Sequence, residues 1–145
     1  MEVFYFEPKE LLPAVILDKA SSTFQIVGTS CPMEPFEFFD PILNWFDNYC
    51  KDPLDETILE LKFNYFNTSS SKFLLKILYK LEDINEMGHD VKIKWYYSEE
   101  DEDMLEEAEE FEEIINIDFD LIPVDDEFID TETDQFHEII NSNRY

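Results

Sequence analysis

The fold is decided by one continuous stretch over residues 57–97, which reads TILELKFNYF at 57–66, NTSSSKFLLKILYKLEDINEMG at 67–88 and HDVKIKWYY at 89–97. Residues 57–66 alternate between apolar and polar side chains, which predicts a half-buried strand. One face of this strand is expected to carry Leu59, Leu61, Phe63 and Tyr65, and the other Glu60, Lys62 and Asn64.

The rest of this stretch completes a strand–helix–strand unit. Residues 67–88 carry apolar side chains at three- and four-residue spacing, which predicts a long helix. Gly88 lies where a helix of this kind ends with a glycine in the C′ position. Residues 91–97 alternate again, so the two strands are expected to be parallel, with a right-handed crossover between them.

Further elements lie on both sides of this unit. Residues 14–17 and 23–27 flank a polar turn and are predicted to form a β-hairpin. Apolar side chains at helical spacing predict a helix over residues 36–49 and another within the acidic run 99–115. The alternation of residues 117–121 predicts a last strand.

The order of elements is therefore expected to be β-β-α-β-α-β-α-β. At least three strands carry charges on one face, whereas the strands of a doubly wound sheet are apolar on both faces. We therefore predict an α/β two-layer sandwich with a mixed sheet and helices on one face. Residues 1–122 are expected to form a single domain. Residues 123–145 are expected to form an acidic C-terminal tail. A short helical pattern near residues 136–140 is the one regular feature in this tail.

The net charge excludes two classes of partner. The chain has 36 acidic and 10 basic residues, a net charge of −26. Nucleic acids are bound through Lys and Arg, and membrane surfaces are anionic, so we expect neither as a partner. A basic protein partner is compatible with this charge. Twenty of the acidic residues, but only one basic residue, lie in residues 96–145.

The compartment and the absence of common nucleotide motifs are also predicted from composition. The N-terminal sequence MEVFYFE has no basic segment and no long apolar run, so neither a signal peptide nor a membrane span is expected. Two cysteines in a chain of this size fit a reducing, cytoplasmic location. Only two glycines are present, which excludes a Gly-rich phosphate loop.

A run of hydroxyl side chains, NTSSS at residues 67–71, lies where the first strand of the unit ends and its helix begins. One interpretation is helix capping, because Asn, Thr and Ser satisfy the free N–H groups of a first turn. The other is phosphorylation at Thr68, because a phosphate there would meet free N–H groups and the positive end of the helix. Lys72, four residues later, could pair with that phosphate.

No other segment carries a strong signal for chemistry. Lys72, Lys76 and Lys80 form a row that is either a solvated helix face or a binding line for a phosphate or an acidic partner. The acidic run 99–103 lacks the central glycine of a calcium loop, and the cysteines and histidines lack metal-ligand spacing. We therefore predict no catalytic residue, no metal site and no cofactor.

Three stretches together resemble one known family. They are FFDPILNWFDNY at 38–49, LELKFNYFNTSSSK at 59–72 and WYYSEEDEDMLEEAEEF at 95–111. From about residue 8 to 122 the chain resembles the SiaC family of bacterial regulatory phosphoproteins. The fold of that family is similar to STAS domains and to anti-sigma-factor antagonists.

The resemblance implies a STAS-like switch protein and not an enzyme. In this family a dedicated Ser/Thr kinase phosphorylates the Thr of an Asn-Thr-Ser-Ser motif, and a PP2C-like phosphatase reverses it. The unphosphorylated form binds and activates a diguanylate cyclase. The matching threonine here is Thr68. The expected switch and partner surface is the rest of the motif: Asn67, Ser69, Ser70 and Lys72.

Three other functions stay open at this stage. The first is a partner switch of the anti-sigma-factor-antagonist type with a different target. The second is an enzyme of unknown class with a site assembled only in the folded chain. The third is an acidic module that binds a basic protein without phosphorylation. Whether Ser69, Ser70 or Ser71 is modified in place of Thr68 also stays open.

Overall fold

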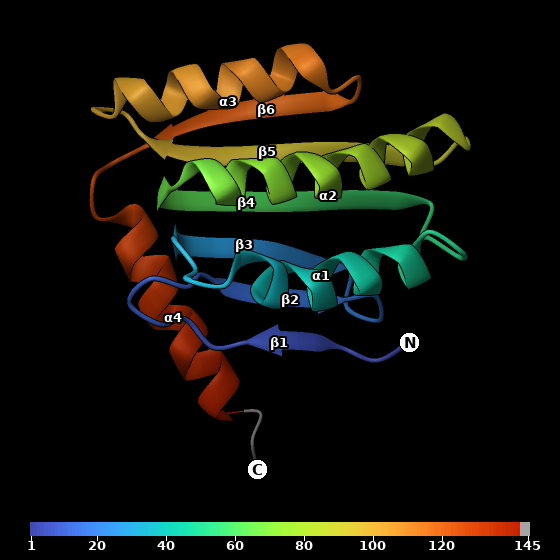
Figure 1. Ribbon diagram of the computed structural model, residues 1–145, viewed down its shortest axis with the longest axis horizontal. Helices are drawn as coiled ribbons and strands as arrows, with labels where there is room; N and C mark the ends of the chain where they lie inside the picture. Colours follow the sequence, from blue (N-terminus) through green and yellow to red (C-terminus); the bar gives the residue numbers. More distant parts are fainter. Residues whose placement is uncertain (143–145) are drawn as a thin grey trace.

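The computed structural model describes the backbone of residues 1–142 and the side chains of residues 1–136 (Figure 1). Residues 143–145 of the expected tail lie outside this range. Along the described chain the elements are β1 (Phe4–Phe6), β2 (Ala14–Asp18), β3 (Thr23–Ser30), α1 (Pro35–Tyr49), β4 (Glu56–Phe66), α2 (Thr68–Glu86), β5 (Asp90–Ser98), α3 (Glu102–Ile114), β6 (Asp118–Val124) and α4 (Phe128–Ser142).

The strands form one six-stranded sheet in the order β1-β2-β3-β4-β5-β6. β1, β2 and β3 pair antiparallel, and β3 to β6 pair parallel. The predicted hairpin is confirmed as β2–β3, and the predicted parallel unit is confirmed as β4–α2–β5, in which Leu59 lies opposite Ile93. β1 was not expected, because its three residues are too few to show a pattern.

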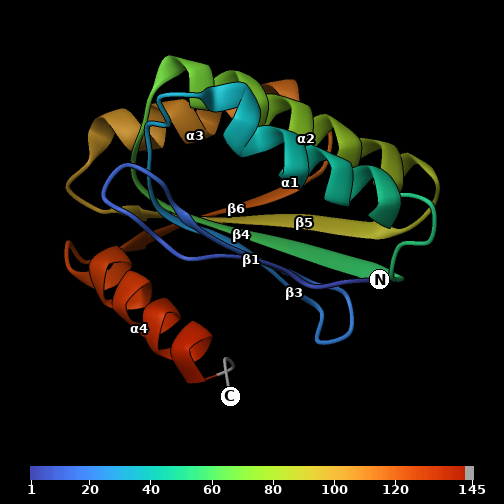
Figure 2. The same cartoon turned by 60° about the horizontal axis from the view of Figure 1, so that its bottom comes forward.

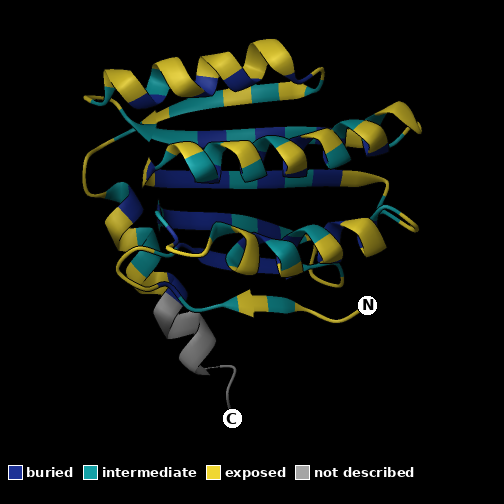
Figure 3. Cartoon of the chain, viewed as in Figure 1, coloured by how far each residue is buried: buried dark blue, intermediate teal, exposed yellow. Residues whose placement is uncertain are grey.

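Three helices, α1, α2 and α3, lie side by side on one face of the sheet (Figure 2). The main core fills the space between these helices and the strands, with Trp95, Tyr49 and Phe46 fully buried at its centre. Exposed residues lie on the outer sides of the helices, while the central strands are buried (Figure 3). The predicted α/β fold with a mixed sheet is confirmed.

Helix α4 differs from the expectation that helices cover one face only. It lies on the opposite face of the sheet, against β3 and β4 (Figure 2). Ile129 and Phe136 are 3% and 5% exposed and pack in a second apolar cluster with side chains of β2 and β3. The expected tail with a short helix near residues 136–140 is thus replaced by a helix that begins at Phe128. Its apolar residues are sparse among acids, so the sequence pattern is weak.

Lys62 was expected on an open polar face, but α4 buries it to 5% exposure. Its Nζ lies 3.2 Å from a carboxylate oxygen of Glu60 and 3.2 Å from one of Glu132. The same ammonium lies over the rings of Tyr96 and Phe128, at 5.1 and 5.7 Å from their centroids. A buried cation requires compensation of this kind, and Glu132 and Phe128 of α4 supply part of it.

The pairing of β3 with β4 shifts by one residue near the end of both strands. Gly28 pairs with Phe63, but the next residue of β3 pairs with Tyr65, so Asn64 is an extra residue in β4. An extra residue reverses the alternation of the strand that follows it. The expectation for Tyr65 is therefore wrong: its side chain is 57% exposed, and Phe66 takes the buried position.

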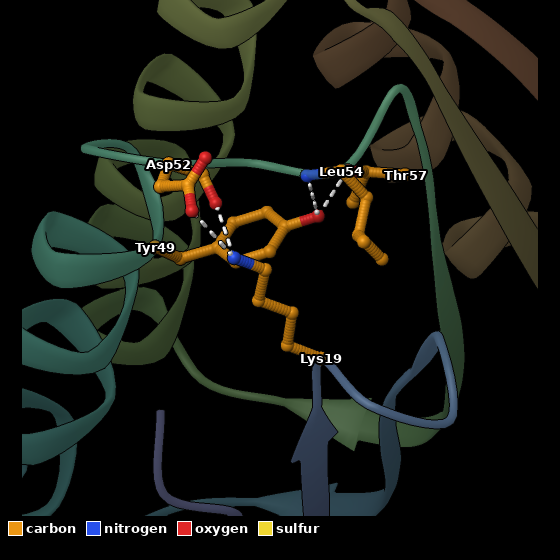
Figure 4. Close-up of polar contacts among 5 residues, drawn as sticks. All are labelled: Lys19, Tyr49, Asp52, Leu54 and Thr57. Carbon is orange, nitrogen blue, oxygen red and sulfur yellow. Dashed lines mark hydrogen bonds and ion pairs between the residues drawn. The ribbon is translucent and has the colours of Figure 1, made fainter.

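The C-terminal end of α1, at Tyr49, is anchored by the polar contacts drawn in Figure 4. The buried Tyr49 hydroxyl lies 2.6 Å from the Thr57 hydroxyl and accepts a hydrogen bond from the Leu54 N–H at 3.2 Å. Lys19 donates to the Asp52 carbonyl at 2.6 Å and to its carboxylate at 3.2 Å. These contacts tie the end of α1 to β4, and the loop that follows α1 to the turn after β2.

Candidate functional site

Helix α2 begins directly after β4, and Asn67 sets its first turn. The Asn67 Oδ1 accepts a hydrogen bond from the Ser70 N–H at 2.9 Å and from the Ser69 hydroxyl at 3.1 Å. The Asn67 N–H donates to the Ser30 carbonyl of β3 at 3.1 Å. Asn67 is therefore the N-cap of α2 and joins the helix to the sheet. The capping interpretation is confirmed for this residue.

The four hydroxyls after Asn67 have different surroundings. Ser69 donates to the capping amide, and Ser71 donates to the Thr68 carbonyl at 2.7 Å. Ser70 is 2% exposed and donates to the carbonyl at the end of β3 at 2.8 Å. The Thr68 hydroxyl is exposed and makes no hydrogen bond with any residue that the structure describes. Thr68 is thus the accessible, unengaged hydroxyl of this run.

The first turn of α2 leaves donors for an anion beside Thr68. The N–H groups of Thr68 and Ser69 have no acceptor in the part of the chain that the structure describes, whereas Asn67 accepts from the N–H groups of Ser70 and Ser71. Lys72 is exposed and lies one helical turn after Thr68. A phosphate on the Thr68 oxygen would lie near these donors and near the positive end of the helix.

The predicted row of three lysines does not act as one site. Lys80 pairs with Asp47 of α1, and the Lys76 ammonium lies 4.9 Å from the centroid of the Phe73 ring. Of the three lysines, Lys72 alone lines the groove between α2 and α3. The lysine row therefore has three separate roles, and only its first member belongs to the site.

A groove of about 750 Å³ lies between α2 and α3 at the end of β4. Its floor and walls include Tyr65, Phe66, Thr68, Lys72, Met104 and Phe111. The strand shift at Asn64 gives this groove its character, because it turns Tyr65 outward to the rim and Phe66 inward against Trp95 and Phe111. Thr68 thus lies on the edge of a hollow with an aromatic base.

The wall of this groove opposite Thr68 is acidic. Helix α3 and its N-cap supply five carboxylates: Asp101, Asp103, Glu106, Glu107 and Glu110. Partial burial raises the pKa of Glu107, and the neighbouring Glu110, Asp101 and Asp103 raise it further. Lys72 is the one basic residue in the groove lining. A cationic group entering the groove is attracted, and an added phosphate meets repulsion from this wall.

Of the predicted switch residues, the structure places Asn67, Thr68 and Lys72 in the groove lining, where Ser71 joins them. Ser69 lies outside the lining and donates to the Asn67 side chain, and Ser70 is a buried anchor. The sequence analysis missed Tyr65, Ser30 and the acidic wall. The wall could have been found from topology, because helices that follow adjacent parallel strands begin at the same edge of a sheet. Tyr65 could not, because nothing in the sequence marks the strand shift.

In the part of the chain that the structure describes, no group of three His, Cys, Asp or Glu residues could hold a metal ion. None of the described helices is long and apolar enough to cross a membrane.

Comparisons with known proteins agree on one family. The sequence model of the SiaC family of regulatory phosphoproteins matches residues 6–124. A protein of Pseudomonas aeruginosa strain UCBPP-PA14 without an assigned function is 33% identical over 101 residues, which cover 70% of this chain and 80% of that protein.

Solved structures give the same result. The crystal structure of apo-SiaC from Pseudomonas aeruginosa matches with a TM-score of 0.78 at 28% identity, over 84% of this chain and 99% of that one. SiaC in its complex with the diguanylate cyclase SiaD, of which it is the activator, matches with a TM-score of 0.79 at 28% identity, over 83% and 99%. Helix α4 lies beyond the end of the family match at Val124. The chain belongs to the SiaC family of regulatory phosphoproteins.

Proposed function

We propose that this chain is a non-catalytic, cytoplasmic switch protein that binds and activates a diguanylate cyclase while Thr68 is unphosphorylated. A Ser/Thr kinase adds the phosphate, and a PP2C-like phosphatase removes it. The observation that carries the proposal is the Thr68 hydroxyl, which is exposed, unengaged and placed at the first turn of α2 beside the groove. The SiaC–SiaD complex supports the choice of partner.

Phosphorylation would act through charge. A phosphate adds about −1.5 to −2 charges at a groove whose lining already holds five carboxylates and one lysine. The first turn of α2 and Lys72 would hold the phosphate on the protein. A partner that packs apolar or acidic side chains against the groove would meet added bulk, negative charge and bound water there, so its affinity for the phosphorylated form would fall.

The first test is site assignment by intact-mass analysis. We expect the chain, incubated with its cognate kinase and ATP, to gain the mass of one phosphoryl group. Thr68→Ala is expected to gain none, and Ser71→Ala is the matched control that should gain the same mass as the unsubstituted chain. Full phosphorylation of Thr68→Ala contradicts the assignment.

The second test is the identity of the partner. Thr68→Ala, used as bait, should recover a protein that converts GTP to cyclic di-GMP, and the purified chain should raise the rate of that cyclase. Thr68→Asp should recover less of it. Recovery of an anti-sigma kinase would assign the alternative target. Binding that falls with salt but is the same for both variants would favour an acidic module without a phosphate switch.

A further inference from the structure

A second groove, of about 580 Å³, lies at the start of α1, outside the Thr68 groove. We call it the α1 groove and define it by its largely apolar lining: Phe6, Leu11, Cys31, Pro32, Met33 and Phe38. Two of these side chains project into solvent to an unusual degree, with Met33 92% and Leu11 49% exposed. Apolar side chains gathered at an open groove are typical of protein-binding surfaces.

The α1 groove has a fixed shape. The Cys31 N–H donates to the Leu11 carbonyl at 2.8 Å, which ties its two loops together. Its floor is an edge-to-face pair of the Phe6 and Phe38 rings, with centroids 5.0 Å apart. A groove held in this way loses little conformational freedom when a ligand binds.

Aromatic contacts connect the α1 groove to α2. The Phe38 ring packs edge-to-face on Phe39 with centroids 4.9 Å apart. Phe39 in turn stacks on Phe73 of α2, with centroids 5.0 Å apart and rings within 4° of parallel. The loop that forms the groove also follows Ser30, whose carbonyl accepts the Asn67 N–H at 3.1 Å. The α1 groove and the Thr68 site are therefore neighbours at one edge of the sheet (Figure 1).

The charge around the α1 groove selects the kind of ligand. Glu10, Glu34 and Glu37 line it, against Lys9, whose ammonium lies over the Phe6 ring at 5.5 Å from its centroid. The whole chain carries a net charge of −26. An apolar groove with an acidic rim is complementary to an apolar side chain flanked by Lys or Arg.

We infer that the α1 groove is a second part of the cyclase-binding surface, and that it receives an amphipathic segment of the cyclase with large apolar side chains flanked by basic residues. This inference rests on the proposed function. Phosphorylation at the Thr68 site switches binding on and off. Apolar contacts in the α1 groove add affinity for the cyclase that does not depend directly on that phosphate.

The test is binding of the full chain to the cyclase that it activates. Met33→Ser is expected to weaken binding by about tenfold or more, since a methionine that becomes buried contributes on that order. Met87→Ser is the matched control, because Met87 is 55% exposed at the other end of α2 and should not contact the partner. Kinase-dependent phosphorylation of Met33→Ser at Thr68 should be unchanged, which shows that the variant is folded.

Two further measurements test the acidic rim and the apolar lining of the α1 groove separately. Glu34→Gln combined with Glu37→Gln should lower the association rate and reduce its dependence on salt. Alkylation followed by peptide mapping should show Cys31 protected in the complex, while Cys50, a free thiol at the end of α1, serves as the internal control and stays as reactive as before.

The outcomes distinguish this inference from the proposed function. If the unsubstituted chain does not bind a cyclase, both fail. If it binds and Met33→Ser binds equally well, the α1 groove is not part of the interface and only this inference fails. A concentration-dependent dimer that Met33→Ser abolishes, without loss of cyclase binding, would overturn the inference by assigning the groove to contact between copies.

Discussion

Asn67 fixes which hydroxyl of the NTSSS run is left exposed and without a hydrogen bond. Its side chain engages Ser69 and the first turn, and the turn it starts carries Ser70 into the interior, where the Ser70 and Ser30 hydroxyls lie 2.9 Å apart. Thr68 comes immediately after the cap, at the first helical position, where it is exposed. The exposure of one hydroxyl is thus a consequence of the capping of the helix.

This dependence predicts the behaviour of Asn67 variants. Asn67→Ala removes the cap of α2 and should lower the free energy of unfolding by about 1 kcal/mol, measured by urea denaturation. Asn67→Asp keeps an acceptor at the same place and adds a charge that favours a helix start, so its stability should stay close to that of the unsubstituted chain. Equal loss in both variants would mean that the amide does more than cap.

At the scale of elements, α4 adds a partial third layer to a fold that has two layers up to Val124. Its attachment combines the apolar contacts of Ile129 and Phe136 with polar contacts at its start. The Lys62 ammonium bridges to Glu132, and the Asn64 amide donates to Asp130 at 3.2 Å. Since Lys62 and Asn64 both lie on β4, the strand that leads to Thr68 also carries α4.

Lys62→Met should loosen α4 without unfolding the sheet. The change leaves Glu60 and Glu132 close together with no cation between them, which should cost on the order of 1–3 kcal/mol in the docking of α4. Hydrogen exchange should therefore become faster in α4 and stay slow in β4 and β5.

Lys92→Met is the control for this experiment. Lys92 forms a pair with Asp120 in which both side chains are 40–49% exposed, and pairs of this kind contribute little. Exchange in α4 should be unchanged in this variant. If α4 exchanges at the same rate in Lys62→Met as in the unsubstituted chain, its apolar contacts alone hold it.

At the scale of the whole molecule, the acidic residues work against folding at neutral pH. The groove wall is one place where this repulsion is concentrated, because burial and neighbouring acids raise the pKa of Glu107. A carboxyl whose pKa is higher in the folded state than in the unfolded state binds its proton more tightly when folded. The native state is therefore penalised above that raised pKa, and the penalty disappears as pH falls to the ordinary pKa of glutamate.

Glu107→Gln should consequently stabilise the chain at pH 7, with a higher urea midpoint. The gain should shrink as the pH is lowered through the raised pKa of Glu107, and it should vanish below the ordinary glutamate pKa of 4.5. Added salt should also reduce the gain, because it screens the repulsion from Glu110, Asp101 and Asp103. A stabilisation that is the same at pH 7 and pH 4 would assign the effect to something other than charge.

Several features were determined by the sequence itself. The period-two and helical patterns of residues 57–97 predicted β4, α2 and β5 as well as their parallel arrangement, because local apolar periodicity reports which face of an element is buried. The hydroxyl run at a strand–helix boundary predicted that Thr68 lies in the first turn of α2. Gly88, with a φ of +100°, follows the end of α2 as expected.

Only the tertiary structure decided which surfaces these elements build. The shift at Asn64 turned Tyr65 outward, α4 buried Lys62, and the packing of Ser70 on Ser30 left Thr68 as the accessible hydroxyl. Each of these depends on contacts between residues far apart in the chain, which no local pattern records. The acidic wall faces Thr68 for the same reason, since neighbouring parallel strands bring the starts of α2 and α3 to one edge of the sheet.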